Sequence, residues 1–167
     1  MAGRRSHPGP AKLLDAPALK QKAIRLLARR DRSRAEMEHL LAGYCDDGGT
    51  LAALLDELQA RGWLSEARLA AQLVHSRRSR SSAVRIRQEL ARHGLKPDVI
   101  AESTAGLEET DLTAALALWR RRFGQPAADR AERERQVRFL LNRGFGHGIA
   151  LKVLRLAAEP DDPGSGG

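Results

Sequence analysis

The stretch LQARGW at residues 58–63 returns in altered form as LARHGL at 90–95 and as LLNRGF at 140–145. Each copy places a leucine four residues before a glycine and ends on a bulky apolar residue. Helices often end on a glycine in the left-handed conformation, because a Cβ atom would clash there. The pattern therefore predicts helix stops at Gly62, Gly94 and Gly144, and it does not indicate a catalytic loop.

The residue that follows such a glycine commonly packs near the residue that lies four positions before the glycine. This rule predicts three apolar contacts, which join Leu58 with Trp63, Leu90 with Leu95, and Leu140 with Phe145. The residue just before each glycine is basic, and a positive charge at that position is favoured by the helix dipole.

The composition indicates an all-α protein. The 167 residues include 25 Leu and 27 Ala but only 5 Val, 4 Ile and 4 Thr. Leu and Ala favour helices, whereas β-branched residues favour strands. Apolar spacing and caps predict nine helices with short connections, including a capping box at Ser33 and Glu36, caps at Thr50, Ser65 and Ser82, and Pro97 in a first turn.

Glycine spacing further predicts a repeat. If Gly43 is admitted, Gly43, Gly94 and Gly144 stand 51 and 50 residues apart, and each would end the middle helix of a three-helix unit. Such a period is typical of helical repeat proteins. The predicted parts are a flexible arm at 1–16, repeats at 17–62, 63–106 and 107–158, and a disordered tail at 159–167.

Motifs for catalysis are missing from the sequence. GFGHG at 144–148 lacks the last glycine of a dinucleotide fingerprint, and no P-loop or H-E-x-x-H motif occurs. The single cysteine, Cys45, precedes two aspartates, which disfavour a reactive thiolate. We expect a non-enzyme without a metal or cofactor. With no apolar run long enough to span a bilayer, and no disulfide framework, we expect it in the cytoplasm.

A formal net charge of +8 points to a polyanion or an acidic protein surface as partner, with general solubility as the alternative. Two runs carry the candidate contact residues. The run 77–92 contains six arginines and one glutamate, and WRRRF at 119–123 adds three, so that the candidates are Arg77, Arg78, Arg80, Arg85, Arg87, Arg92, Arg120, Arg121 and Arg122. A third run, RAERERQVR at 130–138, interleaves acids and predicts a self-paired, solvated face.

The segment 62–95, preceded by LLARRDRSRAEMEHLLAGY, resembles the RecX regulatory protein family. The resemblance rests on Gly62-Trp63-Leu64, on Arg77-Arg78, and on the pattern R-I-x-x-E-L-x-x-x-G that runs from Arg85 to Gly94. It covers about residues 17–156. Two departures are Leu69, where the family usually has phenylalanine, and Ser81-Ser82, where it has a basic residue and glycine.

The resemblance implies an elongated array of three tandem three-helix repeats, in agreement with the glycine spacing. It further implies a partner, the RecA recombinase filament, whose groove such proteins occupy and whose ATPase, strand-exchange and coprotease activities they mostly inhibit, in recombination, DNA repair and the SOS response. It implies possible direct binding to single- or double-stranded DNA and no catalytic residues. We expect a monomer that does not bind membranes.

Two other functions remain open from the sequence. A helix-turn-helix DNA-binding protein could use AVRIRQELARH at 83–93 as its recognition helix, although only Gln88 stands among the arginines as a polar reading residue. A helical adaptor that binds only proteins would show no salt-sensitive affinity for DNA. For the RecA hypothesis, we expect Arg77, Arg78, Arg80, Arg85 and Arg87 to form the main polar anchor, with charge reversal abolishing inhibition.

Overall fold

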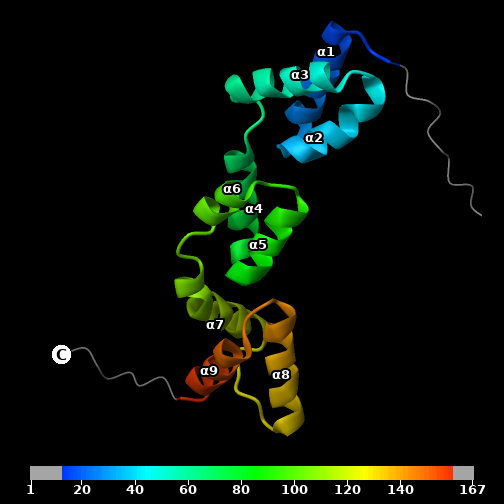
Figure 1. Cartoon of the computed structure of the whole chain (residues 1–167). Helices are drawn as coiled ribbons and strands as arrows, with labels where there is room; N and C mark the ends of the chain where they lie inside the picture. Colours follow the sequence, from blue (N-terminus) through cyan, green and yellow to red (C-terminus); the bar gives the residue numbers. More distant parts are fainter. Residues whose placement is uncertain (1–12, 160–167) are drawn as a thin grey trace, which may run out of the picture. The chain divides into compact units, whose positions relative to one another are not determined.

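A computed structural model of the chain describes residues 13–159 (Figure 1). These residues form only helices: α1 (Ala16–Arg29), α2 (Arg34–Leu41), η1 (Ala42–Tyr44), α3 (Gly48–Ala60), α4 (Glu66–Arg78), α5 (Ala83–Arg92), α6 (Pro97–Ser103), η2 (Glu108–Thr110), α7 (Asp111–Arg122), α8 (Arg130–Asn142) and α9 (His147–Ala158). The predicted all-α class is confirmed. Most of the predicted arm and tail, residues 1–12 and 160–167, lies outside the described residues.

The described residues form two compact units. The first comprises 13–69 together with the short segment 93–96, and the second comprises 70–92 and 97–159. The helix boundaries follow local signals: the serine-rich segment 79–82 separates α4 from α5, and Pro97 is the first residue of α6.

The core of the first unit lies among α1, α2 and α3. Each helix contributes leucines or similar residues at helical spacing: Leu19 and Ala23 from α1, Met37 and Leu41 from α2, and Leu51, Leu54, Leu55 and Leu58 from α3. Each fully buried leucine contributes about 2 kcal/mol through the hydrophobic effect. Helix α2 packs against both α1 and α3, its neighbours along the chain.

The core of the second unit is formed mainly by α7, α8 and α9, which pack pairwise. Trp119 of α7 is 3% exposed and lies in this core. Its indole Nε1 donates a 2.8 Å hydrogen bond to Oε1 of the buried Gln136 on α8, so the polar end of the ring is satisfied inside the core.

The predicted glycine helix stops are confirmed at three positions. Gly62, Gly94 and Gly144 have φ values of +72°, +73° and +87°. Gly43 differs, because it lies within the 3-10 helix η1 and is not among the described glycines with positive φ. The prediction of a glycine stop at Gly43 is therefore wrong in its geometry: α2 tightens into a 3-10 turn, which satisfies its last carbonyls without a left-handed residue.

Of the apolar contacts predicted around these stops, Leu140–Phe145 is confirmed and Leu58–Trp63 is wrong. Leu140 and Phe145 are both buried, and the Phe145 amide donates to the Leu140 carbonyl at 3.2 Å. Trp63 makes the equivalent bond to the Leu58 carbonyl, but its side chain is 44% exposed. The predicted Leu58–Trp63 packing is wrong; the next residue, Leu64, enters the core instead.

Of the four predicted helix caps, the three serines, Ser33, Ser65 and Ser82, are confirmed, and Thr50 is wrong. The hydroxyls of Ser65 and Ser82 accept from amides three residues ahead, as predicted. Helix α3 begins earlier than expected: the Asp47 carboxylate accepts from the amides of Gly49 and Thr50, so Thr50 is not the cap. Aspartate and threonine both cap helices, and the sequence offered both.

A serine cap and a glycine stop meet at a junction in each unit. In the first, the Ser33 hydroxyl donates to the His93 carbonyl at 2.5 Å, and a Cβ atom on Gly94 would lie 2.7 Å from Cβ of Ala35. In the second, the Ser82 amide donates to the Arg143 carbonyl at 3.1 Å, and a Cβ atom on Gly144 would lie 2.6 Å from the Ser82 hydroxyl. These glycines thus serve close packing as well as helix termination.

Glu36 completes the first junction and departs from the predicted capping box. Its amide donates to the Ser33 hydroxyl as expected, while its carboxylate contacts His93 Nδ1 at 2.9 Å and Arg30 Nη1 at 3.2 Å. Burial raises the pKa of the Glu36 carboxyl, but its contacts with His93 and Arg30 lower it more, so the net pKa is below the ordinary value.

We expect Glu36→Gln to destabilise the protein in a pH-dependent way. A carboxyl whose pKa falls on folding stabilises the native state above its unfolded pKa, which is about 4.3, and loses that contribution as pH decreases. Urea unfolding should show a loss of roughly 1–2 kcal/mol at neutral pH, shrinking toward zero in acid. An equal loss at both pH values would contradict the role given to the Glu36 charge.

Candidate protein and nucleic-acid interface

The arginines singled out in the sequence come from three helices and one turn of the second unit. Arg77 and Arg78 end α4, Arg80 lies in the turn 79–82, and Arg85, Arg87 and Arg92 lie on α5. Arg120, Arg121 and Arg122 end α7. The structure divides this set into arginines that are held by carboxylates and arginines that are not.

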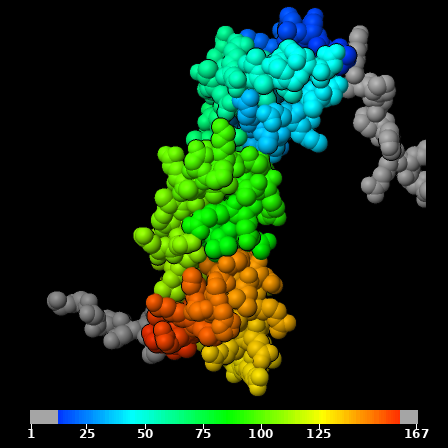
Figure 2. Space-filling view, in the orientation of Figure 1, coloured from blue at the N-terminus to red at the C-terminus, as the bar shows by residue number. Residues whose placement is uncertain are grey.

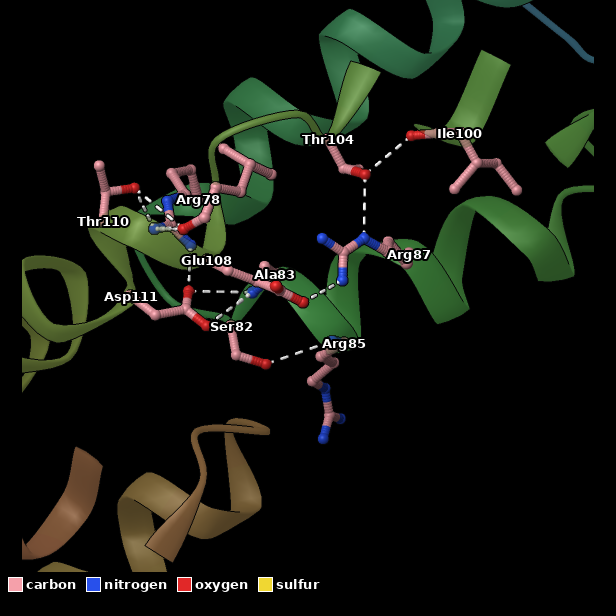
Figure 3. Close-up of polar contacts among 11 residues, drawn as sticks. Arg78, Ser82, Ala83, Arg85, Arg87, Ile100, Thr104, Glu108, Thr110 and Asp111 are labelled. Atoms are coloured by element: carbon pink, nitrogen blue, oxygen red, sulfur yellow. Dashed lines mark hydrogen bonds and ion pairs between the residues drawn. The ribbon is translucent and has the colours of Figure 1, made fainter. Parts of the chain in front are cut away.

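Arg78 is the most deeply held. Its Nη1 lies 2.6 Å from the Asp111 carboxylate, and its Nη2 donates to the Leu107 carbonyl at 2.7 Å and to the Thr110 hydroxyl at 2.5 Å. Figure 3 shows these contacts of Arg78. The Arg78 side chain is 20% exposed and that of Asp111 only 7%. Arg78 therefore links the end of α4 to the start of α7.

Asp111 has a second partner, which the sequence did not reveal. Its two oxygens accept from the Ala83 amide at 3.0 and 3.3 Å. Ala83 is the first residue of α5, where amide hydrogens lack partners within the helix and a negative charge is favoured by the helix dipole. A single buried carboxylate thus serves α4, α5 and α7.

Arg77 and Arg87 are also paired within the unit. Arg77 Nε lies 2.9 Å from both oxygens of Glu89, and this hydrogen bonding raises the pKa of Arg77. Arg87 Nε donates to the Thr104 hydroxyl at 3.0 Å, and its Nη1 pairs with Glu108. Figure 3 shows Arg78 and Arg87 turned toward these partners, whereas the Arg85 guanidinium points away from them.

The other six candidates form no ion pair within the described residues: Arg80, Arg85, Arg92, Arg120, Arg121 and Arg122. All six are exposed. Four of them donate to backbone carbonyls, for example Arg85 Nη1 to Asn142 at 2.7 Å and Arg121 Nη2 to Ser79 at 2.6 Å. A carbonyl orients a guanidinium but leaves its positive charge uncompensated.

These contacts bring together residues that are far apart in the sequence. The Arg121 contact places the end of α7 at the turn that carries Arg80, and the Arg85 contact reaches the end of α8. On α5, Arg85, Gln88 and Arg92 are exposed at a spacing of about one helical turn each, so they share one face. We name Arg80, Arg85, Arg92 and Arg121 the open arginine set.

Such a set can bind two kinds of partner. A guanidinium whose charge is free can form forked hydrogen bonds to carboxylates or phosphates. Among the described residues, no cluster of histidine, cysteine, aspartate or glutamate could hold a metal ion, and no helix is both long and apolar enough to cross a membrane.

Comparison with known proteins relates this chain to proteins built of three-helix domains. Two family models match, those of the second RecX three-helix domain over residues 65–103 and the third over 109–154. The tandem three-helix organisation is therefore confirmed, while the boundaries predicted from glycine spacing stay predictions.

Related sequences and structures extend the similarity to most of the chain. The regulatory protein RecX of Leptothrix cholodnii is 48% identical over 145 residues, which is 87% of this chain and 92% of that protein. The RecX of Ralstonia nicotianae is 41% identical over 150 residues, with coverages of 87% and 94%. The crystal structure of RecX from Lactobacillus salivarius has the same fold, with a TM-score of 0.71, 14% identity, and coverages of 85% and 96%.

Proposed function

Because the chain belongs to the RecX family of regulatory proteins, we propose that it binds the RecA recombinase filament and modulates, mostly by inhibition, the filament's ATPase, strand-exchange and coprotease activities. The proposal places the protein in the cytoplasm, in recombination and the SOS response. The observation that carries it beyond the family name is the open arginine set, which leaves positive charge available to a partner.

The set of contact residues proposed here is smaller than the set expected from the sequence. Arg80, Arg85, Arg92 and Arg121, with Arg120 and Arg122 beside them, contact RecA or its bound DNA. Arg77, Arg78 and Arg87 instead hold the second unit together through Glu89, Asp111 and Glu108. Using those three in a partner contact would break ion pairs that stabilise the fold, which costs binding free energy.

Several moderate contacts are enough for tight binding when one protein carries them all. A chain that contacts neighbouring RecA protomers, or RecA and DNA together, gains from the high effective concentration of its second contact. Contacts between exposed arginines and anions also weaken with salt, because counterions compete for both partners. The proposed complex should therefore be salt-sensitive.

The exposed face of α5 supports a second candidate function, direct DNA binding. Gln88 lies between Arg85 and Arg92 on that face, and glutamine and arginine both form hydrogen bonds with base edges. Binding to DNA in the absence of RecA, with preference for one duplex sequence, would favour this second function. Sequence-neutral binding would leave the RecA proposal in place.

We expect the double variant Arg80→Glu/Arg85→Glu to lose inhibition of RecA's DNA-dependent ATPase by at least about tenfold, because two proposed contacts become repulsive. The matched control is Arg25→Glu/Arg29→Glu on α1, which makes the same change in net charge at exposed arginines of the first unit. Circular dichroism of both variants should match the native helix content. Equal loss in both would refute the assignment to the open arginine set.

A further inference from the structure

Helices α8 and α9 border two hollows on the surface of the second unit. One, of about 590 Å³, has Val137, Leu141 and Leu151 among its lining residues. The other, of about 600 Å³, includes Pro126, Leu151 and Leu154. The two hollows share Leu151 and Arg133 as lining residues, and we name them together the α8–α9 groove. Figure 2 shows α8 and α9 side by side, in yellow to orange and in orange to red.

The apolar floor of this groove is open to solvent. Leu141 is 39% exposed and Leu151 is 36% exposed. Other large apolar side chains at the surface of the described residues, such as Leu40 and Val84, stand on separate helices, whereas Leu141 and Leu151 line the same hollow. Exposed leucines that share a concave surface are typical of a binding site.

The rim of the groove is strongly basic. Arg133, Arg138, Lys152 and Arg155 line it and take part in no ion pair within residues 13–159. The acidic residue that lines it, Glu134, pairs with Arg130 at 3.0 Å. The run 130–138 is thus only partly self-paired: Arg130 and Arg135 have carboxylate partners on α8, whereas Arg133 and Arg138 do not.

An occupant of this groove must satisfy both features at once. Apolar side chains gain by covering Leu141 and Leu151, and carboxylates gain by meeting the four unpaired cations. A nucleic acid offers the negative charge but no aliphatic anchors. An acidic protein segment with leucine-like residues one helical turn apart offers both, in the manner of an amphipathic helix in a groove.

We propose that the α8–α9 groove is a binding site for an acidic segment of a partner protein that carries apolar anchor residues. The groove and the open arginine set have no residue in common. The proposal goes beyond the proposed function, because it requires neither RecA nor DNA.

The test uses the full chain and a fluorescein-labelled peptide of Asp and Glu with two leucines one helical turn apart. Fluorescence anisotropy should show saturable binding, which weakens about tenfold in Leu151→Ser and in Arg133→Gln. The matched controls are Leu40→Ser, with a leucine that is 38% exposed, and Arg25→Gln, and both should bind like the native chain. A peptide with serines in place of leucines should bind at least about tenfold more weakly.

Four results would overturn this proposal. The first is absence of peptide binding, or equal effects of the groove variants and their controls. The second is displacement of the peptide by an oligothymidylate whose own binding is lost in Arg133→Gln and Leu151→Ser, which would assign the groove to nucleic acid. The third is concentration-dependent dimerisation that Leu151→Ser abolishes, which would assign it to a second copy of the chain. The fourth is tighter peptide binding by Asp161→Asn/Asp162→Asn, which would assign it to the chain's own C-terminal segment.

Discussion

Replacing Asp111 by alanine is expected to lower the free energy of unfolding by about 3–5 kcal/mol, which is the usual effect of removing one partner from a buried ion pair. The variant would leave the Arg78 guanidinium, which is 20% exposed, without its carboxylate. It would also leave the Ala83 amide without an acceptor at the start of α5. Both losses fall on the same small region.

Urea unfolding followed by circular dichroism measures this effect, and Asp129→Ala is the matched control. Asp129 also accepts from a helix-start amide, that of Glu132 at 2.8 Å, but it is exposed and forms no ion pair with an arginine within residues 13–159. Loss of an exposed cap costs about 1 kcal/mol. If the two variants lost equal stability, the link through Arg78 would contribute nothing.

Replacing Gly144 by alanine has the second-largest expected effect, a loss of about 2–5 kcal/mol. The φ value of +87° strains any residue with a Cβ atom, which costs roughly 1–2 kcal/mol. The added atom would also lie 2.6 Å from the Ser82 hydroxyl and 2.8 Å from Cβ of Arg85. Relieving that overlap costs about 1–3 kcal/mol more.

Gly62 separates these two causes experimentally. It has nearly the same backbone conformation, with φ of +72°, but a Cβ atom there would meet nothing within 4 Å. Gly62→Ala should therefore lose only the cost of strain. Thermal unfolding of both variants tests the difference, and an equal loss of stability would show that the junction at Ser82 tolerates an added methyl group.

Much of this fold could be predicted from the sequence because its signals are local. Leucine spacing, serine caps and the glycines at 62, 94 and 144 each act within a few residues, and local chemistry decided those boundaries. Predictions failed where two local signals competed. Asp47 caps α3 in place of Thr50, and Leu64 packs in the core in place of the neighbouring Trp63.

The candidate interface could be predicted only in part. Which of its arginines pair with carboxylates depends on contacts between residues far apart in the sequence. Arg78 meets a carboxylate 33 residues away, and Arg87 meets one 21 residues away. No spacing rule distinguishes these two arginines from Arg85, whose partner is a backbone carbonyl 57 residues away. The sequence located the basic surface, and packing selected which of its charges remain available.

The most direct test of the RecA proposal is a titration of RecA-catalysed ATP hydrolysis on single-stranded DNA, using RecA from the same organism and increasing amounts of the native chain. We predict that the rate falls well before the protein equals RecA in concentration, and that added salt weakens the inhibition. An unchanged rate at equimolar protein would contradict the proposal.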